Sequence, residues 1–251
     1  FIDIWGVVHN GLDLHDNAVN VLNKLHEMNK EFILLTNAPR PNQTVISQLK
    51  NMGLKNYYDR VFTSGEAALK FLLKDFNNKK FYHIGPKRDF DLFKKFENLK
   101  VELIDNADYI LCTGLFENNQ TDLNYYKKIL KEKVKKKMIC TNPDLVVDRG
   151  NDREYCAGSI AKIFEEINGV VVYFGKPYPP VYKISAKLKN KKVLCIGDNL
   201  NTDIRGANMQ NFDSLLISGG VHRNEFLNSN LGELLKSYNV KLNYTQNELK
   251  W

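Results

Sequence analysis

Phe1-Ile-Asp-Ile-Trp5 opens the chain with a short apolar run that carries a carboxylate at its third position. Three more apolar runs also lead to a polar residue: Phe32-Ile-Leu-Leu-Thr-Asn37, Val170-Val-Val-Tyr-Phe-Gly-Lys176 and Val193-Leu-Cys-Ile-Gly-Asp198. Helical patterns separate these runs, and continuously apolar runs are typical of short strands that are buried on both faces. The sequence therefore predicts an α/β fold with a doubly wound parallel sheet in its core.

The polar residues at the ends of these runs are Asp3, Thr36, Lys176 and Asp198. Ligands of open α/β sheets bind just outside the carboxyl ends of the strands, so we expect these four side chains to meet there. Carboxylates that face an incoming phosphate repel it unless a hard cation is present, and oxygen ligands with open positions suit Mg²⁺. The sequence therefore predicts a magnesium-assisted phosphoryl site.

The alternation of strands and helices starts twice along the chain. It runs from the first residue to about residue 77, and it starts again near residue 78, with further strands expected at 80–84, 109–112 and 138–140. We therefore predict a core domain formed by residues 1–77 and 174–251, with a smaller α/β cap domain at residues 78–173 inserted between them.

Composition narrows the class of protein. The chain has 251 residues, of which 43% are hydrophobic and 26% charged, as in ordinary soluble globular proteins. No apolar stretch approaches the roughly 20 residues of a membrane helix, and no basic-then-apolar leader opens the chain, so we expect a cytoplasmic protein without a membrane partner. The four cysteines lack paired CxxC spacing, which favours free thiols over disulfides or zinc.

A formal net charge of +7 raises the question of a nucleic-acid partner. Five lysines are concentrated in one short stretch, at positions 131, 133, 135, 136 and 137. This stretch lies between a helical pattern and a strand pattern, which favours a solvated helix end, so we expect no nucleic acid. Because Phe1 already lies inside a strand pattern, we also expect the native protein to have residues upstream.

The motifs resemble those of the haloacid dehalogenase superfamily of phosphohydrolases. After Asp3 come Leu35-Thr36-Asn37, Gly175-Lys176-Pro177 and Gly197-Asp198-Asn199, with Asp203 five residues beyond Asp198, in the family's order. The insert, together with Thr-Asn-Ala-Pro-Arg-Pro (36–41), Thr-Asn-Pro-Asp (141–144) and Phe-Gly-Lys-Pro-Tyr-Pro-Pro (174–180), is similar to subclass IIA, the nitrophenylphosphatase-like members with a C2-type cap. The resemblance spans essentially the whole chain. It implies Mg²⁺-dependent hydrolysis of small organic phosphate monoesters and, loosely, a homodimer formed through the caps.

The resemblance also assigns roles to single residues. Asp3 would attack phosphorus and form an aspartyl-phosphate intermediate. Asp3 and Asp198, with the backbone carbonyl of Trp5, would bind the metal, and Asp203 would hold a metal-bound water or orient Lys176. Lys176 would offer its charge to the phosphoryl oxygens. Further contacts to these oxygens would come from the Thr36 hydroxyl and from the backbone N–H groups of Asn37 and Ala38.

Trp5 departs from the family pattern. Phosphatases of the family usually carry a second aspartate there, which protonates the leaving oxygen, whereas an indole has no proton to give to an alkoxide. General acid catalysis is worth about 10²–10⁴-fold in rate, so we expect slow turnover of alkyl phosphates and faster turnover of aryl or acyl phosphates. A rival hypothesis is a catalytically quiet protein that binds a phosphorylated metabolite. His9 is a weaker candidate for a substitute acid, and a structural role is favoured for His222.

Substrate contacts are expected from the cap. Asn142, Asp144, Arg149 and Arg153 lie in the stretch that returns towards the core, and an arginine there would hold a second anionic group. From this stretch we select Asn142 and Arg149 as substrate-binding residues. The alternative is that they are ordinary loop and salt-bridge residues.

Overall fold

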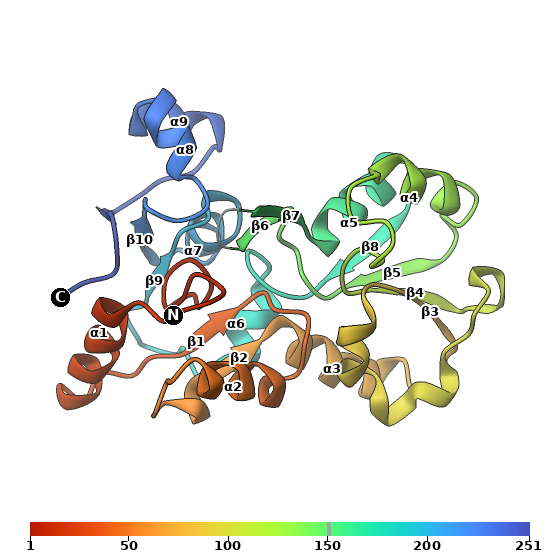
Figure 1. The fold of residues 1–251 in the computed structure, drawn as a ribbon, viewed down its shortest axis with the longest axis horizontal. Coiled ribbons are helices and arrows are strands. Elements are labelled where there is room, and N and C mark those ends of the chain that lie inside the picture. The colour runs from red at the N-terminus through yellow and green to blue at the C-terminus, as the bar shows by residue number, and fades with distance from the viewer. Residues whose placement is uncertain (150–151) are drawn as a thin grey trace.

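The structure is a computed structural model that describes residues 1–149 and 152–251. Its strands form a core sheet, a second sheet and one hairpin, with helices packed around them (Figure 1). The core strands are β1 (Leu34–Thr36), β2 (Val61–Thr63), β9 (Leu194–Gly197), β10 (Asp213–Ile217) and β11 (Tyr244–Gln246). β1 pairs with β2, and β10 lies between β9 and β11, all in parallel.

The first three residues occupy the centre of the core sheet. On one side, Ile2 N donates to Ile33 O (2.9 Å) and Leu35 N donates to Ile2 O (2.8 Å). On the other side, Asp3 N donates to Ile196 O (2.8 Å). The run at the start of the chain therefore joins β1 to β9, and it brings Asp3 to the carboxyl edge of both.

This first strand is shorter than the sequence indicated. The backbone turns at Ile4, whose carbonyl accepts hydrogen bonds from Val8 N (2.8 Å) and His9 N (3.1 Å). Gly6 follows with φ of +83°, a conformation that suits glycine. The prediction of a strand through residue 5 was wrong at its end, because the turn starts directly after Asp3.

Helices cover both faces of the core sheet. The core helices are α1 (Asp16–Glu27), α2 (Asn42–Asn51), α3 (Ser64–Asp75), α6 (Pro179–Ser185), α7 (Arg205–Gln210), α8 (Arg223–Asn228) and α9 (Leu231–Ser237). Leu34 packs in one apolar cluster with α1 and α2, whereas its neighbour Leu35 packs in another with α3 and α6. Successive strand residues point to opposite faces, so the predicted doubly wound arrangement is confirmed.

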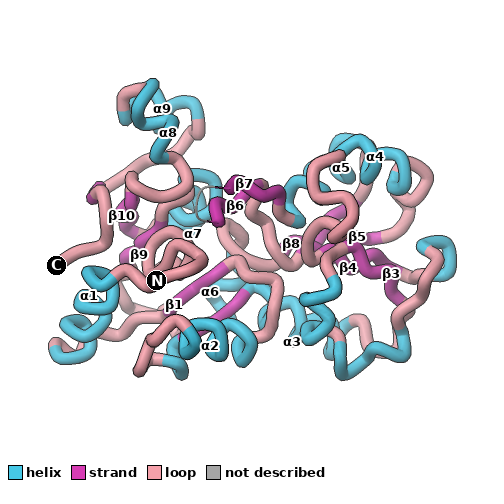
Figure 2. Tube along the Cα trace, in the orientation of Figure 1, coloured by secondary structure: helices cyan, strands magenta, loops and turns pink. Residues whose placement is uncertain are grey.

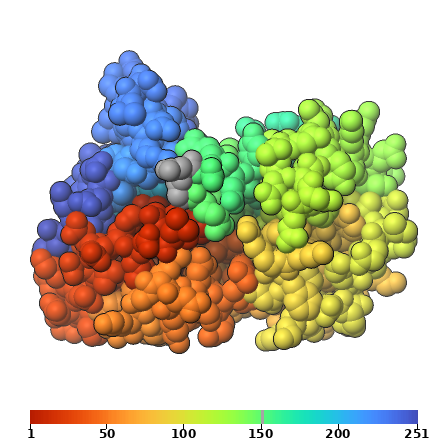
Figure 3. All heavy atoms as spheres, viewed as in Figure 1, coloured from red at the N-terminus to blue at the C-terminus, as the bar shows by residue number. Residues whose placement is uncertain are grey.

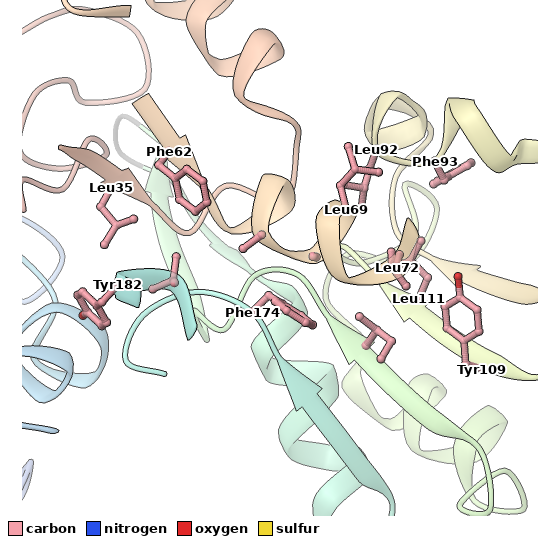
Figure 4. Packing of buried hydrophobic residues seen from close by; sticks show 14 of the residues in the cluster. Leu35, Phe62, Leu69, Leu72, Leu92, Phe93, Tyr109, Leu111, Phe174 and Tyr182 are labelled. Atoms are coloured by element: carbon pink, nitrogen blue, oxygen red, sulfur yellow. The ribbon is translucent and has the colours of Figure 1, made fainter. Parts of the chain in front are cut away.

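The second sheet is also parallel, in the order β3-β4-β5-β8. Its strands are β3 (Phe81–Ile84), β4 (Tyr109–Cys112), β5 (Lys137–Cys140) and β8 (Val170–Tyr173), and α4 (Leu123–Leu130) and α5 (Ala157–Glu166) cover one face. The other face joins the core through one apolar cluster. Figure 4 shows Phe174 and Leu72 of this cluster between Leu35 of the core and Leu111 of the second sheet. Burying each such side chain stabilises the fold by about 1.5–3 kcal/mol.

The run at 170–176 is less buried than its strand pattern indicated. Val170–Tyr173 pairs with β5 at the edge of the second sheet and not in the core sheet. Val170 is 55% exposed, as an edge strand permits, so the prediction of a strand buried on both faces was wrong here. Lys176 consequently lies in the connection between β8 and α6.

A hairpin of β6 (Val146–Arg149) and β7 (Asp152–Tyr155) lies between the two sheets, where Figure 2 shows its strands in magenta. Sequence patterns did not predict this hairpin, nor α8, α9 and β11. All four cysteines, which belong to the described part of the chain, are free, as predicted, and all four are buried. Within residues 1–149 and 152–251, the helices are too short or too polar to cross a bilayer.

Polar contacts also join the core to the segment that follows β3 of the second sheet. Arg40, which follows β1, bonds Asp91 through Nη2 (3.1 Å) and approaches Asp89 Oδ1 at 3.9 Å. Asp89 is 3% exposed, and burial raises its pKa to about 6, although a Thr113 hydrogen bond and the charges of Arg88 and Arg40 act in the opposite direction. Asp89 therefore holds its proton more tightly in the folded protein than in the unfolded chain.

This pKa makes the free energy of unfolding depend on pH. Between about pH 4 and pH 6 the unfolded chain has released the Asp89 proton while the folded protein retains it, so stability falls as pH rises. We expect Asp89→Asn to reduce this fall by about 2–3 kcal/mol in urea denaturation series at pH 4, 5, 6 and 7. If the free energy of unfolding of Asp89→Asn depends on pH as steeply as that of the wild type, the raised pKa of Asp89 is contradicted.

Candidate active site

A cavity of about 250 Å³ opens where the carboxyl ends of the core strands meet the β6–β7 hairpin. On the face shown in Figure 3, the green segment that contains the hairpin lies against the red N-terminal segment. Seven of the sequence-predicted residues line this cavity: Asp3, Trp5, Thr36, Asn37, Lys176, Asp198 and Asp203. Trp5 is half-buried, and the other six are less than a tenth exposed. Residues separated by most of the chain's length therefore line one cavity.

Different elements supply these side chains. Asp3 ends the short segment that joins β1 to β9 in the core sheet. Thr36 is the last residue of β1, and Asp198 follows β9. Asp203 lies in the π-helical turn Leu200–Ile204, whose start is capped by the Asn199 side chain. Lys176 alone arrives from the connection that leaves the second sheet.

The ammonium of Lys176 lies between two carboxylates. Its Nζ donates to Asp3 Oδ1 (2.5 Å) and to Asp203 Oδ1 (2.7 Å). Burial alone lowers the pKa of Lys176, but the charges of Asp203 and Asp3 outweigh it and raise this pKa well above its ordinary value. Lys176 is therefore a permanent cation in this site.

One cation does not balance the acids of the cavity. Oxygens of Asp3, Asp198 and Asp203 all lie within 4.8 Å of one another. Burial, and then the charge of Asp203, raise the pKa of Asp198 to about 7. Burial also raises the pKa of Asp3 well above its usual range, against the pull of Lys176. A cluster of oxygen ligands with excess negative charge fits a hard divalent cation.

Asn37 uses its side chain to hold the connection in place. Its Oδ1 accepts from Lys176 N (2.7 Å), and its Nδ2 donates to Lys176 O (3.0 Å) and to Asp144 Oδ1 (3.1 Å). Ala38 N donates to Thr36 Oγ1 (3.2 Å), and Ala38 lies outside the cavity lining. The side chain of Asn37 thus fixes the backbone that carries Lys176.

The two residues predicted to bind substrate from the cap, Asn142 and Arg149, also lie outside the cavity lining. Asn142 Oδ1 accepts from Asp144 N (3.0 Å) and so shapes the turn that carries Asp144. Arg149 pairs with Glu154 (3.1 Å), and its guanidinium lies 5.1 Å from the centre of the Trp5 ring. In this structure both residues position neighbours of the cavity.

The sequence analysis did not predict several residues that line the cavity. Among them are His15, Asp148, Asn199, Thr202 and Arg223. Asp144, which the sequence analysis named without assigning it to the site, also lines the cavity, and burial raises its pKa to about 6. Its position in Thr-Asn-Pro-Asp (141–144) was the available signal. Arg223 and His15 belong to no recognisable motif, and long-range packing brings them here.

His9 and His222 have structural roles. His9 is 3% exposed, and its Nδ1 accepts a hydrogen bond from Gly11 N (2.8 Å). Burial lowers the pKa of His9 to about 4, so its ring is neutral at pH 7. His222 Nε2 accepts from Leu200 N (3.1 Å). The His222 contact agrees with the structural role favoured for that residue, and the His9 ring is engaged within its own turn.

The chain is similar to known hydrolases. Residues 1–98 match the family model described as haloacid dehalogenase-like hydrolase, and residues 173–238 match a HAD-hydrolase-like model. A haloacid dehalogenase-like family hydrolase from Brucella suis 1330 is 30% identical, with a TM-score of 0.81 over 99% of this chain and 94% of that one. Dihydroxyacetone phosphatase of Corynebacterium glutamicum is 25% identical over 87% of this chain and 80% of its own length. 5'-nucleotidase YutF of Bacillus subtilis is 23% identical over 92% of this chain and 90% of its own length.

The buried ion pairs predict the effect of removing Lys176. Lys176→Met leaves Asp3 and Asp203 without their cation, and breaking a buried pair costs about 3–5 kcal/mol. We expect a loss of that size in urea denaturation at pH 8 without divalent cations, and a smaller loss at pH 5, because the stranded carboxylates take up protons.

Lys191→Met is the matched control, because Lys191 pairs with Glu31 at the surface. We expect the free energy of unfolding of this variant in urea to equal that of the wild type. Equal destabilisation by both substitutions would contradict the central role of Lys176.

Proposed function

This chain belongs to the haloacid dehalogenase-like hydrolase family, and from that premise we propose that it hydrolyses small organic phosphate monoesters with Mg²⁺ as its cofactor. The observation that carries the proposal is the buried group of Asp3, Asp198 and Asp203 around Lys176 in one cavity. At about 250 Å³ the cavity is at the small end for ligand pockets, which favours a compact ester. The curated relatives named above act on phosphate esters of this general kind.

Asp3 is the proposed nucleophile. Lys176 holds Asp3 Oδ1, which orients the carboxylate and leaves Oδ2 to attack phosphorus. The new bond is an aspartyl-phosphate, the bond between phosphorus and the ester oxygen breaks, and its electron pair leaves with the alcohol oxygen. Water then hydrolyses the aspartyl-phosphate and regenerates the carboxylate. The Thr36 hydroxyl and the Asn37 backbone N–H are the proposed donors to the phosphoryl oxygens.

The proposed metal ligands are Asp3, Asp198 and the carbonyl of Trp5, with Asp203 beside them. When bound, Mg²⁺ supplies positive charge that offsets both the acids and the phosphoryl oxygens. The support is the closeness of the three carboxylates, whose oxygens lie within 4.8 Å of one another, and the burial and neighbouring acids that together raise the pKa of Asp3 and of Asp198. Asp198 Oδ2 also accepts from Val221 N (2.8 Å), which fixes its orientation.

We expect hydrolysis of a phosphate-ester panel to require Mg²⁺. Chelation with EDTA should abolish product formation, and Asp3→Asn and Asp198→Asn should each lower kcat by at least about 10³-fold, because each removes charge that touches the reacting group. Lys191→Met should keep wild-type rates. Turnover that persists undiminished in EDTA, or in Asp3→Asn, would exclude this mechanism.

Trp5 leads to a preference among leaving groups. Its indole N–H donates to the Asp148 carbonyl (2.6 Å), so it is engaged with the protein and, in any case, releases no proton at neutral pH. Leaving groups that depart as stable anions need no acid. We expect kcat for 4-nitrophenyl phosphate to exceed that for glycerol phosphate by about 10²-fold or more.

Trp5→Asp tests this assignment because it introduces a carboxyl at the same position. The variant should raise the glycerol phosphate rate relative to the 4-nitrophenyl phosphate rate. If the parent protein hydrolyses both esters equally fast, the argument from Trp5 is lost.

The same observation at Trp5 favours a second candidate, a protein that binds a phosphorylated metabolite without turnover. Both candidates use the cavity and Mg²⁺, but only the hydrolase forms a covalent bond at Asp3. Acid quenching followed by mass spectrometry of the peptide that carries Asp3 separates them. A phosphorylated peptide supports the hydrolase, and its absence in the presence of bound ester supports the binder.

A further inference from the structure

The β6–β7 hairpin is fastened to the core on the rim of the cavity. Trp5 Nε1 donates to Asp148 O (2.6 Å), and Arg223 Nη1 donates to Asp148 Oδ2 (2.5 Å). Arg153 Nη2 donates to Val221 O (2.7 Å). Arg153 also bonds Asp148 within the hairpin (2.8 Å). Two loops of the core and the hairpin therefore form one connected polar network.

These contacts reach the two acidic loops of the site directly. Trp5 lies two residues after Asp3. Val221, whose carbonyl receives Arg153, donates its own N–H to Asp198 Oδ2 (2.8 Å). The hairpin is thus coupled to the backbone on both sides of the phosphoryl position.

The fold provides a dedicated space for the Trp5 ring. The ring packs edge-on against His9, with centroids 5.0 Å apart, and the Arg149 guanidinium covers it at 5.1 Å. A Cβ at Gly11 would approach Trp5 Cζ2 to 2.6 Å, which real side chains do not tolerate. Gly11 also has φ of +95°, so both the space and the backbone there suit glycine.

A second cleft of about 580 Å³ lies on the other side of the hairpin, between α4, α5 and the region of α8 and α9. Val146 and Val221 line both this cleft and the cavity that holds Asp3. The second cleft also contains Lys127, Lys162, Tyr155 and Tyr238. Glu166 and Glu225 line it as well. The two valines and the Arg153 hydrogen bond therefore separate a small acidic site from a larger cleft that carries aromatic groups and charges of both signs.

We propose that the hairpin is a partition that sets the largest leaving group this site accepts. Trp5 and Arg153 hold it in place as positioning residues. With the partition in place the cavity admits a compact ester; with it released, the two spaces join and admit a nucleoside monophosphate. Its phosphate would lie at Asp3, and its base would lie against the tyrosines of the second cleft. This inference rests on the proposed phosphatase function.

Two variants release the partition in different ways. Arg153→Met removes the hydrogen bonds to Val221 and Asp148, and Trp5→Phe keeps an aromatic ring but loses the N–H donor. Arg88→Met, an exposed arginine outside both linings, is the matched control. The measured quantity is the ratio of kcat/KM for AMP to kcat/KM for glycerol phosphate, with Mg²⁺ present.

We expect this ratio to rise at least about 10-fold in Arg153→Met, which corresponds to one charge-assisted hydrogen bond, and to rise in Trp5→Phe as well. Arg88→Met should keep the wild-type ratio. A ratio that stays at the wild-type value in both release variants overturns the partition. Failure of the wild type to hydrolyse any ester of the panel overturns the proposed function instead.

A second readout works without turnover. The chain contains two tryptophans, so in a Trp251→Phe background the fluorescence comes from Trp5 alone. Arg153→Met in this background should increase quenching of Trp5 by acrylamide, and Arg88→Met should not. Increased quenching together with an unchanged substrate ratio, or no change in quenching, counts against the proposal. Circular dichroism confirms that each variant is folded.

Discussion

The ammonium of Lys176, held between Asp3 and Asp203, is the constraint on which the architecture of the site depends. A buried charge is stable only with partners at short distance, and here the two partners lie 173 and 27 residues away in the sequence. The start of the chain, the return from the second sheet and the turn after β9 must all meet within a few ångströms. Asn37 supports this meeting by bonding the backbone of Lys176 on both sides.

The cluster around Lys176 carries more negative than positive groups. Asp3, Asp198 and Asp203 outnumber the single ammonium, and burial prevents water from screening their repulsion. Such an arrangement lowers the stability of the metal-free protein, because carboxylates in a dry site must keep protons or find a cation. The excess charge also supports the proposed binding of Mg²⁺, which would offset the repulsion between these acids and an anionic ester. Stability and function therefore draw on the same residues in opposite directions.

Two kinds of contact join the core to the rest of the molecule. An apolar cluster that includes Leu72, Leu111 and Phe174 is continuous from one sheet to the other. The hairpin adds hydrogen bonds. The Trp5 indole donates one of them to the Asp148 carbonyl, and the absence of a side chain at Gly11 leaves room for the Trp5 ring. At the position where the resemblance leads us to expect an acid, this chain thus has a side chain that anchors the hairpin. On the proposed function, the lack of a proton donor and the fastened hairpin would both follow from Trp5.

Sequence alone determined the α/β class, the order of the main strands and the acidic residues at strand ends, because apolar runs and the edge of a parallel sheet are local patterns with a known geometry. Tertiary structure decided that Val170–Tyr173 joins the second sheet and that Lys176 reaches the site from a connection. It also decided the place of the hairpin and the partner of Trp5, which lies 143 residues away. Such contacts depend on how distant segments pack, and no periodicity within either segment records them.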